Sequence, residues 1–280
     1  MGGEAGPAAQ KEVLMVSTDR VESGTDRKTF LRRATAAGAG LAGLAALPGI
    51  ARADEGVGVT PGDTDILIAA EIAEALAVTT YSNIIDTAPF FPRLASDDQG
   101  YIKAARQEEM SHYLLEQSVS GKPSPFTTFF YPPNMFADAQ TTLNVLVSLE
   151  DAFIAAYLVG VRQFSHDNLR VTAARIMGIE SDHRTLARVV APGVVAQDGG
   201  PIEAVTGIQG VAESVDPPNN NGYERTLGWT QISQAVTALL PFASKDAAGQ
   251  AGFDTSKPYQ FNPFTPTLPS PLGEFHSFTG

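Results

Sequence analysis

Two short motifs carry the residue types from which a metal site can be built. Residues 109–112 read Glu-Met-Ser-His and residues 180–183 read Glu-Ser-Asp-His, so each motif places a glutamate three residues before a histidine. Positions i and i+3 of a helix lie on one face, and both side chains of such a pair can reach the same ion. The chain has only four histidines, and two of them share this signature. Both motifs are therefore candidate metal-binding pairs.

Each motif follows a predicted helix in which a glutamate and a tyrosine stand seven residues apart. Glu74 is followed by Tyr81 in the first of these helices, and Glu150 by Tyr157 in the second. Seven residues are two helical turns, so each tyrosine lies on the face of its glutamate and can hydrogen-bond a ligand. Tyr81 and Tyr157 are thus the candidate catalytic residues. Glu71 shares the face of Glu74, and the tyrosine spacing favours Glu74 as the ligand.

The chain therefore contains a duplicated unit, a Glu…Tyr helix followed by a Glu-x-x-His helix. In an antiparallel four-helix bundle, the two units can bring six side chains together at the middle of the core. Four carboxylates and two imidazoles suit two divalent ions of iron or manganese, because carboxylates can bridge the ions while each imidazole caps one. Without metal, four buried carboxylates would repel one another. The candidate ligands are Glu74, Glu109, His112, Glu150, Glu180 and His183.

The other charged residues near these six are expected to lie on the surface. Glu108 precedes Glu109 but points about 100° away from it on a helix, so we expect it to be solvated. The same expectation holds for Asp151, Asp182, His166 and His276.

Apolar residues at helical spacing predict the elements that position the candidate ligands. The first helix is expected at 65–86 with Asp63 or Thr64 as its cap, and the other three at 97–119, 138–164 and 169–190. The sequence shows no alternating strand pattern of any length. Residues 54–190 are therefore predicted to form an all-α bundle.

The segments between and after these helices are rich in proline and aromatic residues. Residues 121–136 contain five aromatic side chains, which predicts that this loop packs onto the helices. Residues 191–280 form a C-terminal extension with a fifth helix from Thr230 to Leu240, and residues 241–280 are expected to be extended. We expect this extension to pack on the bundle.

Residues 1–53 have the features of a polar leader followed by an export signal. Residues 26–33 read Asp-Arg-Lys-Thr-Phe-Leu-Arg-Arg, and a weakly apolar run leads from there to Ala-Arg-Ala at 51–53. Such a succession is typical of a cleaved signal peptide. The stretch is similar to a twin-arginine signal, with Lys28 at the place of the second arginine. We expect export to the periplasm or outside the cell, and no stable membrane span after cleavage, since the apolar run is short.

The composition excludes several classes of protein and site. The 280 residues contain no cysteine, which excludes disulfide scaffolds, thiolate metal sites and iron–sulfur clusters. The formal net charge of −12 argues against a nucleic-acid partner, because phosphate contacts need clustered Lys and Arg.

Residues 63–190 resemble the ferritin-like superfamily in the order of these motifs. More narrowly, residues 130–138, 149–151 and 156–160 are similar to a loop and the third helix of the exported ferritin-like family that includes the desiccation-related proteins. The resemblance implies a ferritin-like antiparallel four-helix bundle in which the six candidate ligands hold two iron or manganese ions.

The leading hypothesis is an exported di-metal carboxylate protein whose ions react with dioxygen or hydrogen peroxide. The expected activity is ferroxidase-like or peroxide-consuming, in oxidative or desiccation defence. An alternative is a non-enzymatic stress or envelope protein in which any metal is structural, and a further one is a relative of the manganese catalases. The sequence gives no signal for an organic substrate pocket. A homodimer is the default assembly for such bundles.

Overall fold

A computed structural model of the chain describes residues 60–190 and 227–267. The predicted leader and export signal, the start of the predicted bundle segment at 54–59, and His276 lie outside the described residues. So does most of the predicted C-terminal extension, namely 191–226 and 268–280.

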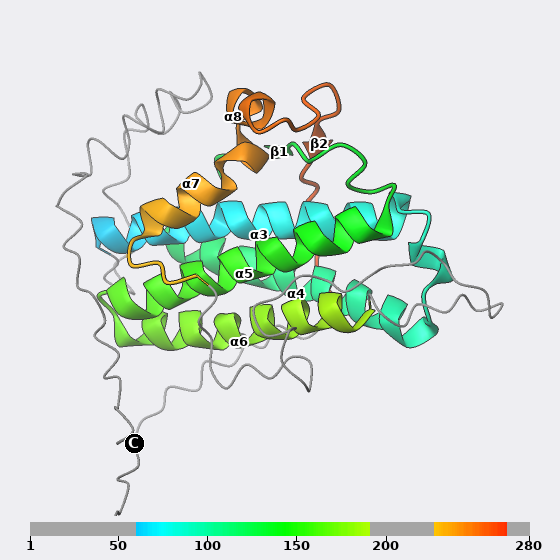
Figure 1. Ribbon diagram of the computed structural model, residues 1–280. Coiled ribbons are helices and arrows are strands. Elements are labelled where there is room, and N and C mark those ends of the chain that lie inside the picture. The colour runs from blue at the N-terminus through cyan, green and yellow to red at the C-terminus, as the bar shows by residue number, and fades with distance from the viewer. Residues whose placement is uncertain (1–59, 191–226, 268–280) are drawn as a thin grey trace, which may run out of the picture.

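In the described part of the chain, four long helices form a bundle (Figure 1). They are α3 (Pro61–Thr87), α4 (Ser96–Ser120), α5 (Ala139–Gln163) and α6 (Asp167–Val190), each close to its predicted range. The prediction of an all-α bundle is confirmed.

The first helix begins earlier than the sequence pattern predicted, because Thr60 is its cap. The Thr60 side chain accepts a hydrogen bond from the Asp63 backbone N–H, and the Asp63 carboxylate accepts from the Thr60 backbone N–H. This reciprocal capping box satisfies two donors at the helix start. Asp63 also accepts a hydrogen bond from the backbone N–H of Ser165 at 2.7 Å. The start of α3 is thereby tied to the turn between α5 and α6.

Chain direction in the bundle follows from the contacts between helices. Short connections make α3–α4 and α5–α6 two hairpins, whereas the long connection 121–138 returns the chain along the bundle before α5 begins (Figure 1). Glu74 precedes Tyr81 on α3, and Glu150 precedes Tyr157 on α5. The Tyr81 hydroxyl is hydrogen-bonded to Glu150, and the Tyr157 hydroxyl to Glu74, so the order of the pairs is reversed between the two helices. Helices α3 and α5 therefore run antiparallel, and their Glu…Tyr faces meet.

In the described part of the C-terminal extension, α7 packs against α3 and α5, away from α6 (Figure 1). The predicted fifth helix is α7 (Ile232–Ala243), and a further short helix, α8 (Lys245–Gln250), follows where an extended chain was expected. A two-residue strand, β2 (Tyr259–Gln260), pairs antiparallel with β1 (Thr128–Phe129) in the long connection. Four of the five aromatic side chains of that connection are buried, as predicted, namely Phe129, Phe130, Tyr131 and Phe136. Phe126 is partly buried against the core.

Covering by α4, α5 and α7 explains why α3 is apolar on nearly all sides, since a helix without a solvent face must be apolar all round. Helix α5 has the same character. Among the described residues it is the helix whose length and composition would allow a membrane span, but 67% of its most apolar window is buried inside the bundle. Its apolarity thus fits a core helix.

Candidate metal centre

The structure brings all six candidate ligands together at the middle of the bundle. Helices α3 and α5 contribute one glutamate each, and α4 and α6 contribute one Glu-x-x-His pair each. Every one of the six side chains is buried, with at most 4% of any residue exposed. The contributing residues are Glu74, Glu109, His112, Glu150, Glu180 and His183.

These six residues fall into two overlapping groups of four. Glu74 and His112 belong to one group, Glu150 and His183 belong to the other, and both groups share the same two glutamates. Within each group the potential ligand atoms lie within 4.8 Å of one another. The shared residues are Glu109 and Glu180. Two ion positions with common carboxylates are the arrangement that bridging requires.

The imidazoles point Nδ1 toward the shared carboxylates. His112 Nδ1 lies 3.3 Å from Glu109 Oε2 and 3.2 Å from Glu180 Oε1. His183 Nδ1 lies 3.0 Å from Glu109 Oε1 and 3.4 Å from Glu180 Oε2. Each shared glutamate thus directs one oxygen toward each histidine. In this arrangement, one carboxylate can bind one ion with each of its oxygens.

The two tyrosines hydrogen-bond glutamates across the α3–α5 interface. The Tyr81 hydroxyl donates to Glu150 Oε1 at 2.7 Å, and the Tyr157 hydroxyl donates to Glu74 Oε1. Each tyrosine therefore holds the glutamate of the other unit, although the spacing had placed it near its own. The Tyr81 ring also packs edge-on against the His183 ring, with centroids 5.8 Å apart.

Burial and mutual repulsion shift the ionisation of the group. Burial, reinforced by the charges of Glu109 and Glu180, raises the pKa of Glu74 well above its ordinary value. Burial and Glu109 do the same for the pKa of Glu150. Burial alone would raise the pKa of Glu109 as well, but the facing imidazoles hold it below its usual range. Without a cation, the site therefore keeps protons on its outer glutamates.

Two neighbouring carboxylates differ from what the sequence pattern suggested. Glu108 is not simply solvated, because its Oε2 lies 2.9 Å from His183 Nε2 and orients that ring. Asp151, expected on the surface, is largely buried in an ion pair with Arg184 at 2.8 Å that joins α5 to α6. The surface expectation does hold for Asp182 and His166.

Glu116 is a buried carboxylate that the sequence reasoning missed. Its Oε1 lies 2.6 Å from the Tyr157 hydroxyl oxygen, so Tyr157 bridges Glu116 and Glu74. The single hydroxyl hydrogen can serve only one of the two carboxyl groups, and the tyrosine oxygen accepts from the other when that group is protonated. Glu116 stands four residues after His112, on the same face of α4, and that spacing could have revealed it. The second unit offers no equivalent, because Ala187 occupies the corresponding position on α6.

Glu71 is buried beside this group but belongs to neither set of potential ligands. Burial raises its pKa to about 7. The pKa of this carboxyl group is thus about 4.5 in the unfolded chain and about 7 in the folded protein. Its contribution to stability is complete below about pH 4.5, and the free energy of unfolding falls as the pH rises from there to about 7.

Glu71→Gln is therefore expected to stabilise the metal-free protein by about 3 kcal/mol at pH 8 and by less than about 1 kcal/mol at pH 5. Urea unfolding at both pH values measures the difference. Asp86→Asn, which changes an exposed carboxylate on the same helix, is the matched control and should have little effect at either pH. Equal stabilisation of Glu71→Gln at pH 5 and pH 8 would contradict the shift.

Comparison with known proteins identifies the bundle. Residues 62–191 match a family model described as a ferritin-like domain. Comparisons with curated proteins and with solved structures gave no significant match. The matched range coincides with α3 to α6 and contains all six residues of the metal centre. This part of the chain is a ferritin-like domain, and through it the protein belongs to the ferritin-like superfamily.

Proposed function

We propose that the ferritin-like domain binds two divalent iron or manganese ions and uses them in redox chemistry with dioxygen or hydrogen peroxide. The observation that supports this is the pair of overlapping ligand groups that share Glu109 and Glu180. Glu74 and His112 would complete one ion site, and Glu150 and His183 the other. When bound, the two ions would supply the electrons that reduce the oxidant.

The ligand atoms of the site fit two divalent metal ions. Five carboxylate oxygens of the four glutamates and the Nδ1 atom of His183 are buried without a hydrogen-bond partner among the described residues. Unpartnered buried polar atoms are costly, so their concentration at one point calls for a compensating cation. Carboxylate and imidazole donors in this ratio suit iron and manganese.

The residues around the ligands have separate tasks in this proposal. Glu108 fixes the orientation of the His183 ring through its Nε2 atom. The Tyr81 and Tyr157 hydroxyls occupy one oxygen of Glu150 and of Glu74, so the other oxygen of each glutamate faces the ions. Tyr157, with Glu116 behind it, also gives the site a hydrogen-bonded path for a proton.

Elemental analysis of the untagged protein after anaerobic loading with Fe(II) or Mn(II) tests the binding. We expect about two ions per chain, followed by consumption of dioxygen or peroxide when the oxidant is added. Less than one ion per chain with an unchanged melting temperature would contradict the proposal. Binding with stabilisation but no consumption would favour the structural alternative. Rapid oxygen evolution from peroxide by the manganese form would favour the manganese catalase alternative.

We further propose that the protein acts after export, in stress or desiccation defence. Support comes from the sequence alone, namely the signal-like segment at 26–53 and the similarity of residues 130–138 to the exported family. Fractionation of cells that produce the full chain, with the mature N-terminus determined by sequencing, tests the location. Intact chain in the cytoplasm would contradict it.

A further inference from the structure

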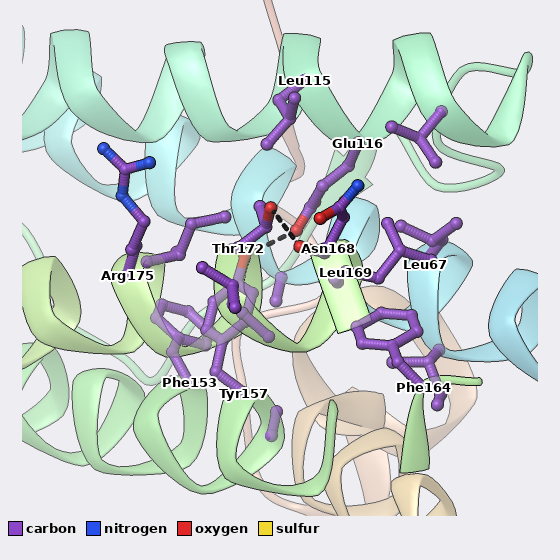
Figure 2. Close-up of a pocket in the computed structure, with 18 of the residues that line it drawn as sticks. Leu67, Leu115, Glu116, Phe153, Tyr157, Phe164, Asn168, Leu169, Thr172 and Arg175 are labelled. Atoms are coloured by element: carbon purple, nitrogen blue, oxygen red, sulfur yellow. Dashed lines mark hydrogen bonds between the residues drawn. The ribbon is translucent and has the colours of Figure 1, made fainter. Parts of the chain in front are cut away.

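A cavity of about 720 Å³ lies inside the bundle beside the metal centre, and the proposed redox function does not use it. All four long helices contribute to its walls (Figure 2). The walls are mainly apolar, with Leu67, Leu115, Phe153, Phe164, Leu169 and Ile176 among them. Its size and lining are those of a small-molecule site.

The cavity has one buried polar group in need of a partner. Glu116 points from α4 into the space between the helices, where its carboxyl group meets Tyr157 (Figure 2). Only 3% of Glu116 is exposed to solvent, and its Oε1 atom is already hydrogen-bonded to the Tyr157 hydroxyl. Oε2 accepts no hydrogen bond from any described residue, and no other atom of the cavity lining shares this condition within the described ranges. A ligand that donates one hydrogen bond would satisfy it.

The cavity reaches the surface between α4 and α6. Ser118 on α4 and Asn168, Val171 and Arg175 on α6 line it and are exposed, with Val171 at 51%. Figure 2 shows Arg175 at one end of the cavity, and Leu67 and Phe164 at the other. A molecule can therefore enter from solvent and extend along apolar walls.

We propose that this cavity binds a mainly apolar small molecule with one hydroxyl group, whose O–H donates to Glu116 Oε2. An ammonium group would bring three donors to a place with a single free acceptor, and its unmatched donors would be costly to bury. A carboxylate would place further acceptor oxygens against Oε2 and offers no hydrogen to donate to it. A hydroxyl group matches the single free acceptor.

Isothermal titration calorimetry with two isomers tests the proposal on the full chain. The probes are 1-octanol and heptyl methyl ether, which have the same atoms but differ in the O–H donor. We expect 1-octanol to bind roughly 3- to 10-fold more tightly, as one additional hydrogen bond predicts. If neither probe binds, the proposal is overturned. This would also be the result if another part of the chain filled the cavity. Equal affinities would overturn the role of Glu116.

Variants place the binding in this cavity. Leu115→Trp fills the cavity from α4 and is expected to weaken 1-octanol binding at least 10-fold. Leu114→Trp, at the neighbouring exposed position outside the cavity lining, is the matched control and should bind as the wild type does. Glu116→Leu should bind both probes with equal affinity. Unchanged 1-octanol affinity in Leu115→Trp would overturn the location.

This inference and the proposed metal function can fail independently. The titrations are done on the metal-free and on the metal-loaded protein. Binding of 1-octanol to the metal-free protein would support the cavity even if no metal binds. Two bound ions without any 1-octanol binding would support the metal centre and overturn the cavity proposal.

Discussion

Glu180→Gln is expected to lower the affinity for both metal ions, whereas Glu150→Gln is expected to lower it for only one. Glu180 directs Oε1 toward His112 and Oε2 toward His183, so it serves both groups of ligands. An amide replaces one oxygen by a nitrogen that carries hydrogens and cannot bind a cation. Glu150 belongs to one group alone, and the Tyr81 hydroxyl already occupies its Oε1.

The expected effects are large, because residues that merely orient a metal ligand already affect affinity 10- to 100-fold. For Glu180→Gln we expect a loss of more than about 100-fold at both positions, so that elemental analysis after gel filtration finds almost no metal. Glu150→Gln should retain about one ion per chain. Circular dichroism at the helix bands verifies that the variants fold.

Asp182→Asn is the matched control for these variants. Asp182 stands two residues after Glu180 on α6, but its side chain is exposed and belongs to neither ligand group. Its metal content should equal that of the wild type. Two ions in Glu180→Gln, or none in Glu150→Gln with intact helices, would contradict the shared and separate roles of these glutamates.

The features predicted best from the sequence depend on spacing within one helix. Residues three or seven positions apart share a face whatever the helix packs against, so the Glu-x-x-His pairs and the Glu…Tyr pairs could be recognised locally. The duplication then indicated that these faces meet. The pairing of Tyr81 with Glu150 was not foreseen, because it depends on how far α3 and α5 are shifted along each other.

The features that were missed arise from contacts between elements. Glu108 on α4 lies beside His183 on α6 because of the way these two helices pack against each other, which spacing within one helix does not reveal. The cavity is lined by residues of all four long helices, and Tyr157 is the lining residue that belongs to one of the motifs. Strand β2 exists because β1 offers its backbone to the C-terminal segment, and two residues are too few for an alternating pattern.

Metal loading is expected to stabilise the protein strongly at pH 8 and little at pH 5. In the metal-free protein, burial lowers the pKa of His112 and His183, but the facing carboxylates outweigh it and hold both values well above the ordinary value. A raised histidine pKa gives stability that is complete below about pH 6.5 and is lost as the pH rises through the folded value. The raised pKa values of Glu74 and Glu150 act in the same direction, because the unfolded chain releases these protons first.

The pKa of Glu109 is shifted in the opposite direction, but this shift affects stability in another range of pH. Its pKa is lowered, so its contribution is present above about pH 4.5 and is lost only on further acidification. From pH 5 to pH 8 the metal-free protein should therefore become less stable. Metal ions bind the deprotonated ligands, so their contribution grows over the same interval.

The melting temperatures of the loaded and metal-free proteins should thus diverge as the pH rises. A free metal concentration 1,000-fold above the dissociation constant contributes about 4 kcal/mol, which corresponds to roughly 10 °C for a domain of this size. At pH 5, protons compete for the same ligands and the difference should shrink to a few degrees. Scanning calorimetry at pH 5, 6.5 and 8 measures both curves. Parallel curves would mean that the ions bind elsewhere. Binding at another site would not displace the protons of Glu74 and Glu150 and would therefore lack this dependence on pH.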